Sequence, residues 1–278
     1  MFGLLMNWMK DHKILPQISD TERQALEAGS VWIDGEFFGG NPDFKKMLAE
    51  AYSRVSAEEQ AFLDGPCEQL LQMIDRYEIA RTKRVPEEVM RFLKEKGFLS
   101  FLIPKQYGGL HFSKLAISTI MAKVMPVNAA VGTFVVIPNT LGAAELILQY
   151  GTEAQKDHYL PRLARGEYIP CFGLTEPTAG SDAASIKAEG EVFRDTDGEI
   201  KLRLNFRKRY ITLAPVANIA TIACKLHDPQ NLLGKGEDVG ISCVLIHKGT
   251  PGFSSGDHHE PIGDAFDNGP LYGKDVVI

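Results

Sequence analysis

The chain has 278 residues, of which 44% are apolar and 24% charged, a composition typical of a folded globular protein rather than a disordered one. Its 30 basic and 36 acidic residues give a formal net charge of −6, which argues against nucleic-acid binding through phosphate neutralisation. The four cysteines lack C-x-x-C spacing and lie in apolar stretches. They therefore predict buried, reduced thiols rather than a disulfide framework or a zinc site. The longest apolar run, residues 129–137, is far shorter than the roughly 20 residues that span a bilayer, and predicts a buried core segment.

Residues 1–42 are predicted to form a polar, irregular lead-in that starts with a short apolar segment, residues 1–10. No basic stretch precedes this segment and no small-residue cleavage site follows it, so it does not have the pattern of a secretory signal. Two interpretations stay open. The segment is either a loosely docked terminus, or an interfacial anchor at a membrane surface or the remnant of a longer membrane-proximal segment.

Residues 43–166 carry the signals of a helical domain. Ser56 and Glu59 have the spacing of a capping box, and apolar residues behind them recur at steps of three and four. Gly and Pro at positions 65–66 interrupt this run, which predicts either two helices or one bent helix. A second capping box begins at Thr152.

Residues 167–278 change to a period of two. Apolar and polar residues alternate over 200–206, the pattern of a half-buried strand. The turn signal at 195–198 predicts a hairpin around it, and further β-branched runs predict an antiparallel sheet or barrel. The last residues, 276–278, are interpreted as part of an interrupted strand. Either the protein has an unusual terminus, or the chain is a piece of a longer protein.

The densest group of chemistry-bearing residues is 173–182, which holds three hydroxyl side chains, two acids and Gly180. A glycine lets the backbone approach a ligand closely, and successive N–H groups in a tight turn suit a phosphate. Thr175 and Ser181 have the donors for a ligand, but such residues equally satisfy local turns. Ser181 is not in a G-x-S-x-G sequence, which argues against a nucleophilic serine.

The segment Cys171–Asp182 resembles the signature of the acyl-CoA dehydrogenase family, flavoenzymes that oxidise acyl-CoA thioesters. The resemblance spans about residues 45–278, and within the family it is similar to the bacterial long-chain (FadE-type) members. It implies an N-terminal helical domain (residues 43–166), a middle β-barrel domain (residues 167–278) and a C-terminal four-helix bundle that this chain lacks, an α+β multidomain fold. Further segments that match in family order are 103–109, 150–156, 158–166 and 208–212.

The resemblance also implies a site for the cofactor FAD. It places the hydroxyl of Thr175 at the edge of the isoalloxazine ring and the Gly180–Ser181 backbone near the phosphates, with Ser181 also bordering the acyl-CoA substrate. Tyr210 takes the place of a tryptophan found in most relatives. The cofactor-binding residues that the resemblance implies are Phe172, Gly173, Leu174, Thr175, Gly180, Ser181, Tyr210, Ile211 and Thr212.

No catalytic residue is assigned within the chain, because the family's catalytic glutamate lies in the missing C-terminal domain. Glu176 is interpreted as a structural carboxylate that fixes the flavin loop. The pair His258–His259 resembles a pair of metal ligands. Adjacent residues on a strand point to opposite sides, however, so we favour a solvated loop without metal.

The function that the resemblance implies is FAD-dependent oxidation of medium- or long-chain fatty acyl-CoA to trans-2-enoyl-CoA in fatty acid β-oxidation. The implied partners are the fatty acyl-CoA substrate and an electron-transfer flavoprotein as electron acceptor, with a homo-oligomer when full length and no nucleic acid. A cytoplasmic location is expected, with peripheral attachment to the inner membrane left open. The alternatives are an acyl-CoA oxidase and a non-catalytic fragment that binds flavin or acyl-CoA; the chain as given is expected to be inactive.

Overall fold

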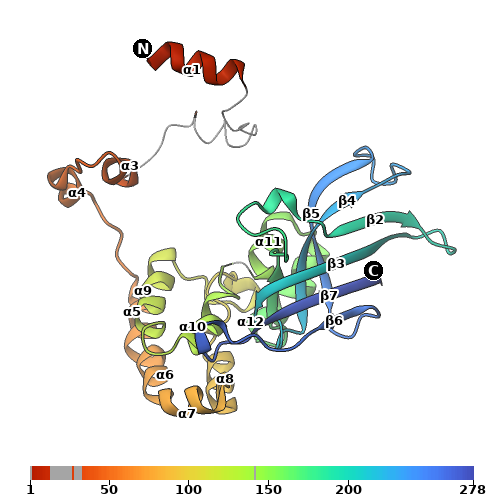
Figure 1. Ribbon diagram of the computed structural model, residues 1–278. Helices are drawn as coiled ribbons and strands as arrows, with labels where there is room; N and C mark the ends of the chain where they lie inside the picture. The colour runs from red at the N-terminus through yellow and green to blue at the C-terminus, as the bar shows by residue number, and fades with distance from the viewer. Residues whose placement is uncertain (1, 13–26, 28–32, 141) are drawn as a thin grey trace. The chain divides into compact units, whose positions relative to one another are not determined.

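The computed structural model describes residues 2–12, 27, 33–140 and 142–278 (Figure 1). The chain divides into two units, Met1–Ser53 and Arg54–Ile278. The first unit contains the helices α1 (Phe2–Asp11), α3 (Ile33–Phe38) and α4 (Phe44–Ala49). The prediction of an irregular lead-in is therefore wrong for α1 and α3, while residues 13–26 and 28–32 lie outside the described residues.

Several apolar side chains of the first unit are exposed. Leu4, Leu5 and Trp8 of α1 face solvent, so both interpretations of this segment stay open. Within the described ranges, no helix is both long and apolar enough to cross a bilayer.

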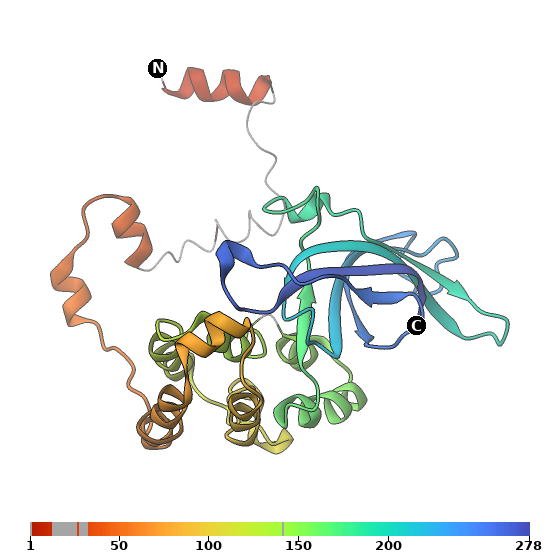
Figure 2. The ribbon, with the colours of Figure 1, turned by 60° about the horizontal axis from the view of Figure 1, so that its bottom comes forward.

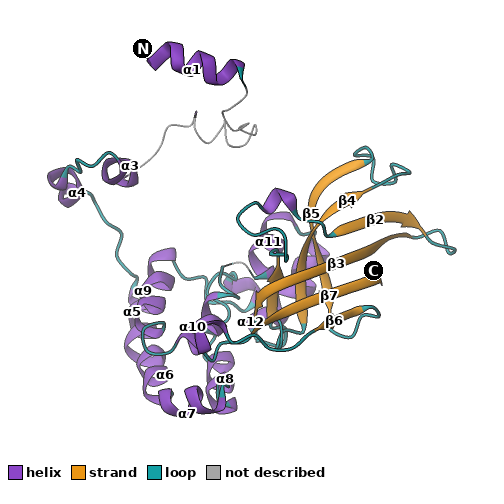
Figure 3. Cartoon of the chain, viewed as in Figure 1, coloured by secondary structure: helices purple, strands orange, loops and turns teal. Residues whose placement is uncertain are grey.

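The second unit begins with a helical region that runs to Ala164, as the sequence predicts (Figure 3). Ser56 caps the first helix through the expected reciprocal bonds with Glu59. The interruption at Gly65 and Pro66 is a π-helical turn inside one continuous helical run, so the bent-helix alternative is correct. The helices are α5 (Ala57–Phe62), η1 (Leu63–Cys67), α6 (Glu68–Met73), α7 (Arg76–Thr82), α8 (Glu87–Glu95), η2 (Lys105–Tyr107), α9 (Lys114–Val124), α10 (Ala129–Val136), α11 (Ala143–Tyr150) and α12 (Glu153–Ala164).

Glu59 ties two helices of this region together. Its carboxylate accepts a 2.7 Å hydrogen bond from the backbone N–H of Ser56 and a 2.6 Å bond from that of Ser113, the residue that caps α9. These backbone hydrogen bonds, with that of Ser113 the strongest, lower the pKa of the Glu59 carboxyl to about 2. One buried carboxylate thus joins the starts of α5 and α9.

We expect Glu59→Gln to destabilise the folded chain by about 2 kcal/mol at pH 7, because two charge-assisted hydrogen bonds lose the charged acceptor. Since the folded pKa lies below the unfolded value, the stabilisation is present above about pH 4.5 and is lost as pH falls toward 2. Denaturant unfolding measured from pH 7 to pH 2 should show that the free energies of unfolding of the unchanged protein and of Glu59→Gln converge at acid pH. Glu58→Gln, on an exposed neighbour, is the control and should change little. A difference in free energy of unfolding that stays the same at every pH would contradict a stabilising role for the ionised Glu59 carboxylate.

The strands form one curled sheet that the helices flank (Figures 1 and 2). The hairpin predicted around residues 195–198 is confirmed as the antiparallel pair β2 and β3. The β1–β4 and β2–β4 pairs are parallel, so the sheet is mixed rather than antiparallel throughout. The strands are β1 (Pro170–Gly173), β2 (Glu189–Arg194), β3 (Ile200–Thr212), β4 (Ile219–His227), β5 (Asp238–His247), β6 (Phe253–Ser255) and β7 (Asn268–Val277).

The two faces of the central strand β4 pack against different neighbours. Ala220, Ile222 and Cys224 join the main core, which extends from the helices into the inside of the curled sheet. Ile219 instead packs with α11 and α12, and Ala223 packs under the loop that follows β1. This second face holds the segment whose sequence carries most of the chemistry.

In the described part of the chain, the cysteines are free thiols. Cys67, Cys171 and Cys224 are buried as predicted, and burial raises the pKa of Cys171 to about 12. The prediction is wrong for Cys243, which is exposed on β5, a strand that presents alternate residues to solvent.

Candidate flavin and acyl site

The loop after β1, residues 174–181, forms a tight turn against the sheet. The backbone N–H of Glu176 donates to the carbonyl of Ala179 at 2.9 Å, which closes the turn. Phe172 and Leu174 anchor it by packing with buried Ala179, Ile186 and Ala223. The turn therefore holds its exposed polar residues on a fixed support.

The end of the turn is open. A Cβ atom built on Gly180 would meet no atom within 4 Å, and Ser181 beside it is exposed. The half-buried Thr175 hydroxyl has no hydrogen-bond partner among the described residues. The turn thus presents free donors and unfilled space.

The second segment, Tyr210–Thr212, ends β3 at an irregularity in the sheet. The register between β3 and β7 shifts between Lys208 and Ile211, and Tyr210 has a φ of 58°. Ile211 is buried, whereas 52% of Tyr210 is exposed with the Arg209 guanidinium 4.3 Å from its ring centre. The bulge thereby turns an aromatic ring outward.

The structure brings these two segments together. The backbone N–H of Arg209 donates to the carbonyl of Thr175 at 2.9 Å, which joins the turn to β3 directly before Tyr210. The side-chain amide of buried Asn268 donates to the carbonyl of Tyr210 at 3.1 Å and to the Thr212 hydroxyl at 3.3 Å. The two segments predicted for the cofactor therefore lie side by side, and Asn268 is a supporting residue that the sequence did not identify.

Glu176 has the structural role that the sequence predicts. Its carboxylate accepts hydrogen bonds from the backbone N–H groups of Lys187 at 2.6 Å and Ala188 at 2.9 Å, and from the ammonium of Lys208 at 2.7 Å. Burial opposes the charge of this carboxylate, but the three hydrogen bonds prevail and lower its pKa. Burial also lowers the pKa of Lys208, against the pull of its partner.

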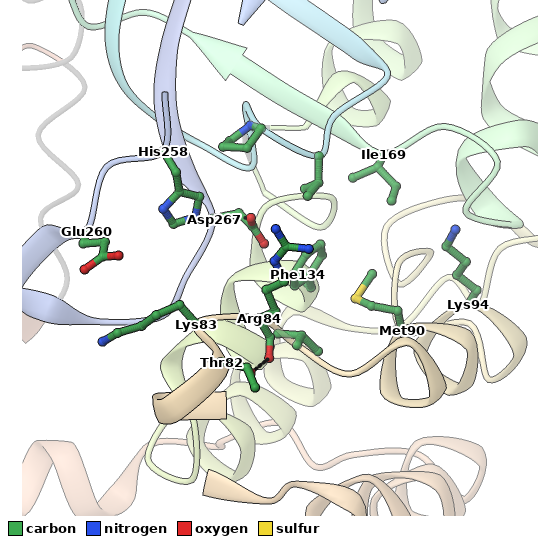
Figure 4. Close-up of a pocket in the computed structure, with 13 residues that line it drawn as sticks. Thr82, Lys83, Arg84, Met90, Lys94, Phe134, Ile169, His258, Glu260 and Asp267 are labelled. Carbon is green, nitrogen blue, oxygen red and sulfur yellow. Dashed lines mark hydrogen bonds and ion pairs between the residues drawn. The ribbon is translucent and has the colours of Figure 1, made fainter. Parts of the chain in front are cut away.

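A pocket of about 780 Å³ lies between the helices and the sheet, next to this surface (Figure 4). The backbone N–H of Leu213, the residue after Thr212, donates to the carbonyl of Asp267 in the pocket wall at 2.8 Å. Lys83, Arg84 and Lys94 supply positive charge. The lining residues are Thr82, Lys83, Arg84, Val85, Met90, Lys94, Phe134, Ile169, Pro215, Val216, His258, Glu260 and Asp267.

The two adjacent histidines have separate partners. His258 lies 3.3 Å from Asp267, whose own pKa burial raises, and His259 lies 3.3 Å from the side-chain oxygen of Asn268. The described residues contain no group of three or more His, Cys, Asp or Glu side chains placed to hold a metal ion.

Comparison with known proteins gives the family. The model of the acyl-CoA dehydrogenase N-terminal domain matches residues 53–167, and that of the acyl-CoA dehydrogenase middle domain matches residues 171–276. The chain belongs to the acyl-CoA dehydrogenase family. The curled sheet and the helices before it are thus the family's middle and N-terminal domains. Among the described residues no helical bundle follows β7.

Three similar proteins illustrate the match. An acyl-CoA dehydrogenase of Bacillus subtilis is 30% identical over 71% of this chain and 47% of its own length. The mitochondrial isovaleryl-CoA dehydrogenase of Pongo abelii is 31% identical over 78% of this chain and 48% of its own length. The acyl-CoA dehydrogenase structure from Geobacillus kaustophilus superposes with a TM-score of 0.67 at 27% identity, over 82% of this chain and 57% of that one. The chain thus spans about half the length of the curated relatives it matches.

Proposed function

We propose that this chain supplies the FAD-binding surface and part of the acyl pocket of an enzyme that oxidises medium- or long-chain fatty acyl-CoA to trans-2-enoyl-CoA. The observation that carries the proposal is the junction of residues 172–181 with residues 210–212, next to a pocket of about 780 Å³. Family membership supports the reaction class, and two proteins of similar structure have been solved in complex with FAD or FADH2.

The residues present fit a flavin. The open space over Gly180 suits a pyrophosphate, which needs close approach to backbone N–H groups. The Thr175 hydroxyl is free to donate to the ring edge, and the outward-facing Tyr210 offers an aromatic surface. When bound, FAD would accept the hydride that leaves the β-carbon of the acyl chain.

The pocket offers both the apolar surface and the positive charge that an acyl-CoA needs. Met90, Phe134 and Val216 give it an apolar part, and its volume lies within the range of small-molecule sites. Lys83, Arg84 and Lys94 offer charge for the phosphates of coenzyme A. These residues would bind and orient the substrate and exclude water from the reacting carbons.

Removal of the α-proton is assigned to a carboxylate outside this chain. Glu176 is buried and its oxygens already accept three hydrogen bonds, so it is not free to act as a base. The resemblance places the family's base in the C-terminal domain, in agreement with this assignment. As acceptor we propose an electron-transfer flavoprotein, since one solved protein of similar fold is an electron-transferring flavoprotein of Acidaminococcus fermentans. We also propose a homo-oligomer, a cytoplasmic location and a role in β-oxidation.

Anaerobic titration of the full-length, FAD-loaded protein with saturated acyl-CoA of increasing chain length tests this function. We expect the visible absorbance of the flavin to bleach, most completely with medium or long chains, and enoyl-CoA to form in equal amount. Flavin that stays oxidised with every saturated acyl-CoA would contradict the proposal. Reoxidation by oxygen as fast as by an electron-transfer flavoprotein would favour the oxidase alternative.

A further inference from the structure

Lys208 is a lysine with no exposed surface in the middle of β3. A buried ammonium is costly unless it is paired and hydrogen-bonded. Its Nζ atom lies 2.7 Å from Oε1 of Glu176 and donates to the carbonyl of Leu174 at 3.1 Å. Both acceptors belong to the turn that follows β1, so the lysine reaches from β3, just before one candidate flavin segment, into the other.

The carboxylate of Glu176 connects three parts of the chain. It receives the Lys208 ammonium from β3 and the N–H groups of Lys187 and Ala188 just before β2. Its own backbone closes the turn with Ala179. No other side chain in the described residues links the turn, β2 and β3 in this way.

Gly173 makes room for this connection. A Cβ at Gly173 would lie 2.7 Å from Cδ1 of Ile222 and 3.3 Å from Cγ of Lys208. The first distance is too short for real atoms, and the second is tight. The absence of a side chain at Gly173 therefore lets the lysine stem pass under the turn.

We propose that the Glu176–Lys208 ion pair is a positioning device that sets the loop 174–181 against Tyr210–Thr212 for flavin binding. The pair lies next to the bond from Arg209 to Thr175 that joins the two segments. The inference rests on the proposed function, since it assumes that these segments hold a flavin. Glu176 and Lys208 act on the cofactor through the backbone that they hold.

The test compares Glu176→Gln, Lys208→Met and the double variant in the full-length protein. Glu176→Gln leaves the buried Lys208 ammonium without a counter-charge, and Lys208→Met leaves the buried Glu176 carboxylate without one, so we expect the Kd for FAD to rise about 100-fold in either case. The double variant removes both charges and should bind FAD more tightly than Lys208→Met. The bound flavin's visible spectrum should shift in the single variants, and hydrogen exchange should quicken at the amides of Lys187, Ala188 and Arg209.

Glu59→Gln is the matched control, because Glu59 is another buried carboxylate that holds backbone N–H groups but lies in the helical region. It should lower the melting temperature without changing the flavin spectrum or the Kd for FAD. The inference is overturned if the Glu176 and Lys208 variants alter flavin affinity and spectrum no more than this control. If the unchanged protein binds no flavin, the proposed function fails, and unaltered exchange at the three amides would overturn the positioning role separately.

Discussion

Replacing Gly180 with leucine is expected to abolish tight flavin binding while leaving the fold intact. No atom lies within 4 Å of a Cβ at this position, and the backbone has no positive φ, so the folded chain tolerates a side chain here. The same open space is the one proposed for the pyrophosphate of FAD. A leucine would fill it, and we expect the Kd for FAD to rise about 100-fold or more.

The measurement is FAD content and melting temperature for the unchanged protein, Gly180→Ala and Gly180→Leu. Alanine adds one methyl group and should give an intermediate loss of flavin, whereas all three proteins should melt within a few degrees of one another without cofactor. Wild-type flavin occupancy in Gly180→Leu would show that the loop is not where the cofactor binds.

Replacing Asn139 with alanine is expected to cost about 3–5 kcal/mol of folding free energy. The Asn139 side chain is buried and accepts from the backbone N–H of Phe101 at 2.7 Å. It also donates to the carbonyls of Phe98 and Val135, each at 2.7 Å. The truncation would leave these groups unpaired in the core and loosen α10, which carries Phe134 of the proposed acyl pocket.

Urea unfolding of the Asn139→Ala variant measures this cost. Thr140→Ala is the neighbouring control, because Thr140 is exposed and makes one bond to the carbonyl of Val136. The control should lie within about 0.5 kcal/mol of the unchanged protein. Equal stabilities for the two variants would mean that the Asn139 hydrogen bonds contribute little.

Local signals in the sequence predict the fold well where a short pattern has one physical solution. The capping boxes at Ser56 and Thr152 are present with both reciprocal bonds, since three-residue spacing determines them. The segment 129–137 is apolar on all sides and carries no period, so it predicts burial but not the helix α10. The parallel pairing of β1 with β4 joins residues far apart in the chain, which no local pattern reveals.

The sequence predicts which segments form the candidate site, but not the contacts that join them. The resemblance points to residues 172–181 and 210–212, and the structure adds that Arg209 and Asn268 join and support them. The burial of Lys208 had a signal: the alternation over 200–206, continued by two residues, places Lys208 on the inner face with Phe206. The basic neighbours on either side favour the opposite prediction, because a run of charged residues usually forms a solvent-exposed face.

Hydrogen exchange with and without FAD tests the central claim most directly. If residues 172–181 and 209–213 form the flavin surface, FAD should slow exchange at the amides of these two segments together. The exchange rates of the amides in α5 and α9, which belong to the helical region and lie far from both segments in the sequence, should not change. Protection confined to other segments, or to only one of these two, would contradict the account.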